Sequence, residues 1–194
     1  RVGTHLAAIG YDAAVTVHQV EDTVRLDPAS FAPLPQRRRA LGLELSGALL
    51  GAGVWLEGNY NRMAGEDYFA RVVAGADYTF PDGTYVMTET LFNGRAEADA
   101  PYPTMDWVES LLSGEPVGRW WTLAGVRRDL AALTALELYA FASPDRSFVI
   151  NPRVQTSIAQ NADITVFGGL TFGREDGAFA PGLRVLVARG TVYF

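Results

Sequence analysis

Charged side chains occur within segments of the chain that otherwise alternate between apolar and polar residues. They fall on the polar side of the alternation and include both signs. Such charges are costly in lipid but stable in a hydrated lumen or in paired networks. They predict either a charged pore wall that selects solutes or structural ion pairs that fill a narrow barrel. The candidate pore-lining residues are Glu44, Glu57, Arg71, Asp77, Glu89, Arg127, Glu137 and Arg153, together with Arg189 in the last strand.

Other chemistries find little support in the residue types. His18 lies close to Asp22, but its local sequence matches no catalytic motif and no serine can be matched to it. His5 is the only other histidine, so imidazole-based metal binding is not expected. The segment 51–53 fits a hairpin turn better than a phosphate-binding loop. The sequence therefore predicts a protein that is not an enzyme, with no metal and no cofactor.

Composition limits the class of protein. The chain has 194 residues, 48% of them hydrophobic, and no cysteine, and its mean hydropathy is +0.06. Yet no stretch of 18 charge-free apolar residues is present, so a transmembrane helix is not expected. Overall apolarity without long apolar runs is what a membrane-spanning barrel predicts. The net charge of −6 argues against a nucleic-acid partner, which requires a basic surface.

Alternation at period two predicts about ten strands. The clearest segment places Leu41, Leu43 and Leu45 on one face and Glu44 and Ser46 on the other. A helix is expected only at 105–113, within a long loop. The predicted strands are 7–18, 40–49, 54–61, 69–80, 84–92, 120–127, 133–142, 148–158, 164–172 and 183–194.

Short and long connections alternate along the chain. Counted back from the C-terminus, every short turn falls at one end of the strands and every longer loop at the other, which predicts an all-β, antiparallel up-and-down transmembrane β-barrel. The short turns are 51–53, 81–83, 129–132 and 160–162, and the longer segments are 21–39, 63–67, 93–118, 143–147 and 173–182.

Aromatic residues gather at the predicted strand ends, where rings settle at the level of lipid headgroups. The loop 93–118 carries Trp107 and the Leu111-Leu112 pair, so it could constrict the lumen, cap the barrel or contact a protein partner. The expected membrane-interface aromatics are Tyr78, Phe80, Tyr85, Tyr193 and Phe194 at the short-turn end, with Trp120, Trp121 and Phe172 at the long-loop end.

The final segment, Leu186 to Phe194, places an apolar or small residue at every second position and ends in an aromatic ring. It resembles the C-terminal signal strand of bacterial outer-membrane β-barrels. Segments 75–80, 89–94 and 147–152 also look like porin-like barrels of Gram-negative bacteria. The resemblance implies an outer-membrane location, contact with the lipid bilayer, and contact with the barrel-assembly machinery through the last strand.

We therefore expect one β-barrel domain over residues 1–194, which is either complete or the C-terminal part of a larger barrel. Ten strands alone would enclose a narrow or plugged interior, whereas open channels need more strands. The preferred function is porin-like passive transport of small solutes across the outer membrane. A plugged barrel with a structural or partner-binding role is one alternative, and a soluble calycin-like barrel with an apolar ligand inside is another.

Overall fold

Eleven strands form a single antiparallel sheet in which each strand pairs with its neighbours in chain order. The computed structural model describes residues 2–6, 10–27, 30, 32–64, 67–113, 117–179 and 181–193. The strands are β1 (Val2–Leu6), β2 (Tyr11–Leu26), β3 (Pro33–Leu49), β4 (Ala52–Met63), β5 (Phe69–Thr79), β6 (Tyr85–Asn93), β7 (Trp120–Ala131), β8 (Thr134–Ala142), β9 (Phe148–Ala159), β10 (Ala162–Phe172) and β11 (Arg184–Val192).

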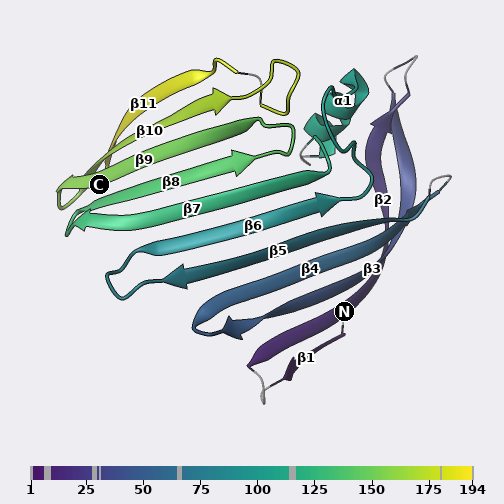
Figure 1. Cartoon of the computed structure of the whole chain (residues 1–194), viewed down its shortest axis with the longest axis horizontal. Coiled ribbons are helices and arrows are strands. Elements are labelled where there is room, and N and C mark those ends of the chain that lie inside the picture. Colours follow the sequence, from purple (N-terminus) through teal and green to yellow (C-terminus); the bar gives the residue numbers. More distant parts are fainter. Residues whose placement is uncertain are drawn as a thin grey trace.

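The sheet is strongly twisted and curved, and the helix α1 (Thr104–Ser113) lies at the end where the long connections emerge (Figure 1). Although α1 follows β6, it contacts β2. Among the described residues, no helix is both long and apolar enough to span a bilayer. The all-β, up-and-down antiparallel architecture is thus confirmed. The sheet is open, because β1 and β11 each pair with one neighbour only within the described part of the chain.

Two predicted boundaries were wrong. The segment 21–39 was expected as a long loop, but most of it continues β2 and β3, whose ladder extends to the pair Leu26 and Pro33. A register shift between Asp22 and Arg25 lets the ladder continue past the end of the clear alternation. A short strand, β1, also precedes the first predicted one.

The predicted alternation of short and long connections is confirmed in part, because 80–84 at one end and 64–68 and 143–147 at the other each leave five residues between strands. At one end the hairpin pairs Leu49–Ala52, Ala131–Thr134 and Ala159–Ala162 each enclose two residues. In the first of these turns Leu50 and Gly51 both have positive φ, of 54° and 85°. Two-residue hairpins favour this geometry because its twist matches that of the strands. At the opposite end, residues 94–119 and 173–183 connect β6 to β7 and β10 to β11.

The two faces of the sheet differ in chemistry, since directly paired residues point to the same side. The apolar face carries Leu41 and Leu43, which are 53% and 49% exposed, and Val17, which is 78% exposed. Between the end rows of this face, the described side chains include no charged group. Among the described side chains, its charged residues lie near the strand ends: Glu21, Arg37, Arg39, Arg62 and Arg184 toward the long loops, and Arg128 toward the short turns.

The opposite, polar face is shaped by glycines that lie beneath aromatic rings. Trp55 pairs with Gly75 and Tyr139 pairs with Gly125. A Cβ atom at either glycine would overlap the ring. The indole N–H of Trp55 also donates a hydrogen bond to a carboxylate oxygen of Glu89 at 3.0 Å. Glycine at these positions thus leaves room for the rings of Trp55 and Tyr139 over the neighbouring strand.

Candidate functional site

All eight predicted pore-lining residues lie on the polar face. Strand pairing places Glu44 opposite Glu57 and aligns Arg127, Glu137 and Arg153 across β7, β8 and β9. The other three are Arg71, Asp77 and Glu89, on β5 and β6. Period-two alternation therefore located this set of side chains, although their role in lining a pore stays a prediction.

Glu137 is the centre of an ion-pair network on β7–β9. Its carboxylate lies 4.0 Å from Nε of Arg127 and 3.4 Å from Nη1 of Arg153. The second terminal nitrogen of Arg153 donates a hydrogen bond to Gln155 at 2.8 Å. The arginine side chains are 57% and 41% exposed, and ion pairs this exposed contribute little to stability. The network mainly fixes the orientation of Arg153.

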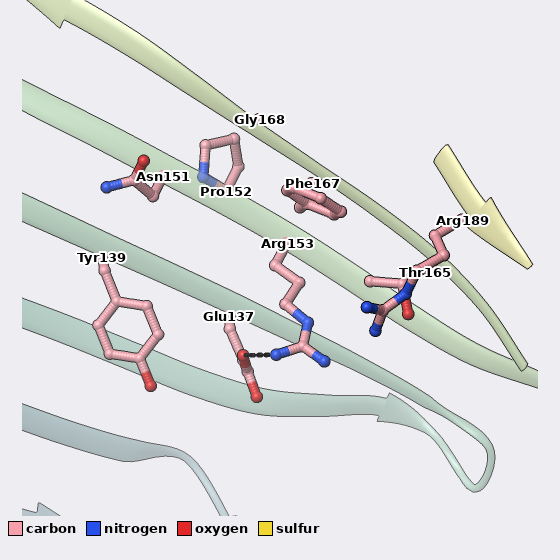
Figure 2. A pocket seen from close by; sticks show the side chains of 9 residues that line it. All are labelled: Glu137, Tyr139, Asn151, Pro152, Arg153, Thr165, Phe167, Gly168 and Arg189. Atoms are coloured by element: carbon pink, nitrogen blue, oxygen red, sulfur yellow. Dashed lines mark hydrogen bonds and ion pairs between the residues drawn. The ribbon is translucent and has the colours of Figure 1, made fainter. Parts of the chain in front are cut away.

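A pocket of about 370 Å³ opens beside this network, over β8–β11 (Figure 2). It lies where the ladder between β9 and β10 is interrupted, since pairing stops at Arg153–Phe167 and resumes at Ile150–Leu170. Pro152 lies within this gap and has no N–H to donate to β10. Pro152 thus coincides with the opening in the sheet. The lining residues are Glu137, Tyr139, Asn151, Pro152, Arg153, Thr165, Phe167, Gly168 and Arg189.

The pocket combines rings with hydrogen-bond donors. Tyr139 and Phe167 supply apolar surface, and Asn151 supplies an amide. Arg189 is paired with Thr165 across β10 and β11, and both side chains line the pocket in Figure 2. Thr165 is buried, with only 4% of the residue exposed. Arg153 is already committed to Glu137 and Gln155, whereas Arg189 has no ion pair in the described part of the chain. Such a pocket can hold a small polar or anionic solute, with its negative group at Arg189.

The polar face is electrostatically uneven. Four carboxylates, Glu44, Glu57, Asp77 and Glu89, lie on β3–β6. Within this region Tyr85 donates a hydrogen bond from its hydroxyl to Asp77 at 3.1 Å. The β7–β11 part of this face carries both signs in equal number: Arg127, Arg153 and Arg189 with Asp129, Glu137 and Asp163. A solute that crossed this face would therefore meet an acidic excess on β3–β6 and mixed charge on β7–β11.

Ring pairs mark the end rows of the apolar face. At the long-loop end, the ring centroids of Phe92 and Trp120 are 4.7 Å apart, and those of Phe148 and Phe172 are 4.9 Å apart. At the short-turn end, the Tyr78 and Phe80 centroids are also 4.9 Å apart. Four of the predicted interface aromatics, Tyr78, Phe80, Trp120 and Phe172, thus belong to these pairs.

Three other predicted interface aromatics lie on the polar face, because their polar atoms have partners there. Tyr85 bonds Asp77, and Tyr193 donates a hydrogen bond from its hydroxyl to Asp163 at 3.2 Å. The Trp121 indole N–H donates to the carbonyl oxygen of Val117 at 2.6 Å. Sequence reasoning located these rings at strand ends but did not resolve which face they occupy. Phe194 lies outside the described residues.

The long loops converge on a buried carboxylate that the sequence did not single out. Asp145, 1% exposed, belongs to the β8–β9 loop. It accepts hydrogen bonds from the backbone N–H and hydroxyl of Ser147 at 2.8 and 2.5 Å. It also accepts bonds from the Ala178 amide at 2.7 Å and from the Tyr102 hydroxyl at 3.2 Å. One side chain therefore joins the β6–β7, β8–β9 and β10–β11 loops.

The electrostatics of this loop junction favour the ionised carboxylate. Burial by itself raises the pKa of Asp145, but the hydrogen bonds from Ser147, Ala178 and Tyr102 outweigh burial and lower the pKa below its ordinary value. Tyr102, Val117 and Ala178 form a small apolar cluster around it. The predicted long loop 93–118 is thus packed against the other long loops.

The structure also places the residues that were considered for catalysis and metal binding. His18 lies on the polar face of β2, opposite Ala40. No group of three or more potential metal ligands occurs among the residues that the structure describes. Comparison of the chain with protein-family models, with curated proteins and with solved structures gives no match. We therefore infer the function from the chemistry of the two faces of the sheet and from the loop junction.

Proposed function

We propose that the chain forms the wall of a β-barrel in a bacterial outer membrane, with its polar face toward a lumen that passes small polar solutes. One observation carries this proposal. The apolar face is exposed, yet its described side chains bear no charge between the end rows of β2–β11. Soluble monomers rarely expose contiguous apolar patches larger than a few hundred Å². Lipid is the environment in which such a face is stable.

Strand length supports the same placement. Strands β4 to β11 contain between 9 and 12 residues each. About 9–11 residues cross the hydrocarbon core when a strand is tilted. Ring pairs lie at both ends of this span, and the long loops share one end. Amphipathic rings at two levels and loops of unequal length are typical of outer-membrane barrels.

The leucines of β3 separate the membrane proposal from the soluble alternative. A calycin-like barrel would bury Leu41, Leu43 and Leu45 inside and expose Glu44 and Ser46, whereas the membrane proposal places the same leucines against lipid. In the open sheet Leu41, Leu43 and Ser46 are all exposed, so the environment of the leucines has to be measured. Detergent dependence tests this point: we expect the protein to aggregate without detergent, and a monodisperse protein in plain buffer would contradict the membrane proposal.

A plugged barrel remains the second candidate function, and the loop segment 94–119 favours it. This segment contains α1, which reaches β2, and Tyr102, which bonds the loop junction at Asp145. The segment would therefore restrict the long-loop mouth of a barrel. In that case the polar face would serve mainly as a paired internal network.

Single-channel recording in planar bilayers separates the two candidates. We expect discrete conductance steps from the reconstituted protein, and a shift of selectivity toward cations in Arg189→Glu, which reverses the uncommitted charge of the pocket. Arg184→Glu is the matched control, because Arg184 lies on the apolar face at the long-loop end. Protein that inserts into the bilayer but shows no conductance would contradict transport and leave the plugged barrel.

A further inference from the structure

The apolar face ends, on the long-loop side of β3 and β4, in three arginines that we call the rim arginines: Arg37, Arg39 and Arg62. Arg39 and Arg62 are directly paired across the two strands. The next row toward the middle of the sheet is Leu41 with Tyr60. The rim arginines therefore lie directly beyond the uncharged part of the face.

The pairing of Arg39 with Arg62 is unfavourable by itself, because like charges directly opposite each other destabilise a sheet. Arg39 donates a hydrogen bond from Nε to the neutral side chain of Gln19 at 3.0 Å. Arg62 lies over the ring of Tyr68, with its Cζ atom 5.3 Å from the centroid. Neither contact supplies a negative charge.

Among the described side chains, Glu21 is the one acid paired with the rim arginines in the ladder, opposite Arg37. Within the described residues, no ion pair within 4.0 Å connects a rim arginine to any carboxylate. Counted together with Glu21, the three rim arginines still carry a formal charge of +2.

The opposite end of the same face differs. Its single charged residue in the described part of the chain, Arg128, lies 3.6 Å from a carboxylate oxygen of Asp82. Among the described residues, the positive charge of the apolar face that lacks an ion pair thus lies on the long-loop side, where Arg184 of β11 is also found. This asymmetry distinguishes one leaflet of a membrane from the other.

We infer that the rim arginines bind the phosphate groups of an anionic lipid in the leaflet on the long-loop side. This inference rests on the proposed placement of the apolar face in lipid. A guanidinium presents a planar fork of donors that binds phosphate oxygens in pairs, and two opposed guanidiniums can share one phosphate. Tyr60 and Tyr68 stack beside them, with centroids 5.3 Å apart. These rings place the arginines at headgroup depth, where basic side chains meet lipid phosphates.

The test uses the full chain in neutral detergent and a glycolipid that carries two phosphates. Retained lipid is measured by native mass spectrometry, with the same glycolipid after removal of its phosphates as the comparison. We expect preferential retention of the phosphorylated lipid, weakened by salt, and an affinity about tenfold lower in Arg39→Gln/Arg62→Gln. Arg128→Gln is the matched control and should bind like the wild type, because its charge already has a partner.

Several outcomes would overturn the inference: equal retention of the dephosphorylated lipid, equal binding by the double glutamine variant, or equal loss in Arg128→Gln. Inorganic phosphate that competes as well as the glycolipid would show a site for free phosphate instead of lipid. Arg39→Lys/Arg62→Lys provides a second variant that keeps the charge, and it should bind more weakly than the wild type because lysine lacks the planar fork. If the wild type inserts into vesicles but shows no preference for the phosphorylated lipid, only the inference about the rim arginines is contradicted. If the wild type does not insert into vesicles, the barrel proposal itself is contradicted.

Discussion

Removal of the Asp145 carboxylate should release the long loops from one another. In Asp145→Ala, the backbone N–H groups of Ser147 and Ala178 lose their acceptor at 2.8 and 2.7 Å. A hydrogen bond to a charged group contributes about 1.5–3 kcal/mol. Two such bonds, taken at the lower value, give a loss of about 3 kcal/mol in the free energy of loop opening. The open fraction of the loops should then rise roughly 100-fold.

Limited proteolysis of the folded protein in detergent measures this opening. When loop opening and closing are faster than cleavage, the cleavage rate follows the open population. We expect fast cleavage within 94–119 and 173–183 in Asp145→Ala, while the strands remain protected. Asp99→Ala is the control, because its contact with Arg174 is long, at 3.9 Å, and both side chains are exposed. Equal cleavage of the wild type and Asp145→Ala would refute the role assigned to the loop junction.

Three further perturbations follow from the same structure. Leu43→Arg places a charge mid-way along the apolar face and should cost about 2–4 kcal/mol in urea unfolding from lipid vesicles; an unchanged midpoint would exclude lipid contact at this position. Gly75→Val should displace the ring of Trp55 and lower stability by about 1–3 kcal/mol in the same assay, whereas Gly190→Val, where a Cβ meets no atom within 4 Å, should have little effect. The pKa of Asp145 in the folded protein lies below its ordinary value of 3.8. The ionised carboxylate therefore stabilises the loops fully above pH 3.8, and this stabilisation is lost as the pH falls through the folded pKa. Loop cleavage by pepsin should accordingly rise below about pH 4 in the wild type but not in Asp145→Ala.

The sequence was sufficient for most of the sheet because side chains in a strand alternate with a fixed period of two. That period located the strands from β4 to β11 and placed Glu137 and Arg153 on one face. It failed over 21–39, where Pro33, Pro35 and three consecutive arginines interrupt the apolar pattern although β3 continues through them. Backbone pairing with β2 extends the strand there, and such pairing does not require alternating apolar and polar side chains.

The loop junction could not be predicted, because its partners are distant in sequence. The spacing of Asp145 and Ser147 is a local signal for a turn in which a carboxylate accepts backbone hydrogen bonds. Nothing local connects that turn to Tyr102 or Ala178, which lie 43 and 33 residues away. The pocket beside Pro152 has the same origin. Its lining residues come from four strands, and only the strand register brings them together.

Site-directed labelling of β3 in a membrane tests whether the apolar face of the sheet contacts lipid. The chain has no cysteine, so single cysteines at consecutive positions from 41 to 46 report on one strand without interference. In proteoliposomes, we predict that a water-soluble thiol reagent modifies the cysteines replacing Glu44 and Ser46. Fluorophores attached at 41, 43 and 45 should instead be quenched by brominated lipid. Uniform labelling at all six positions, or odd positions shielded from water but not quenched by lipid, would contradict a membrane-facing apolar surface.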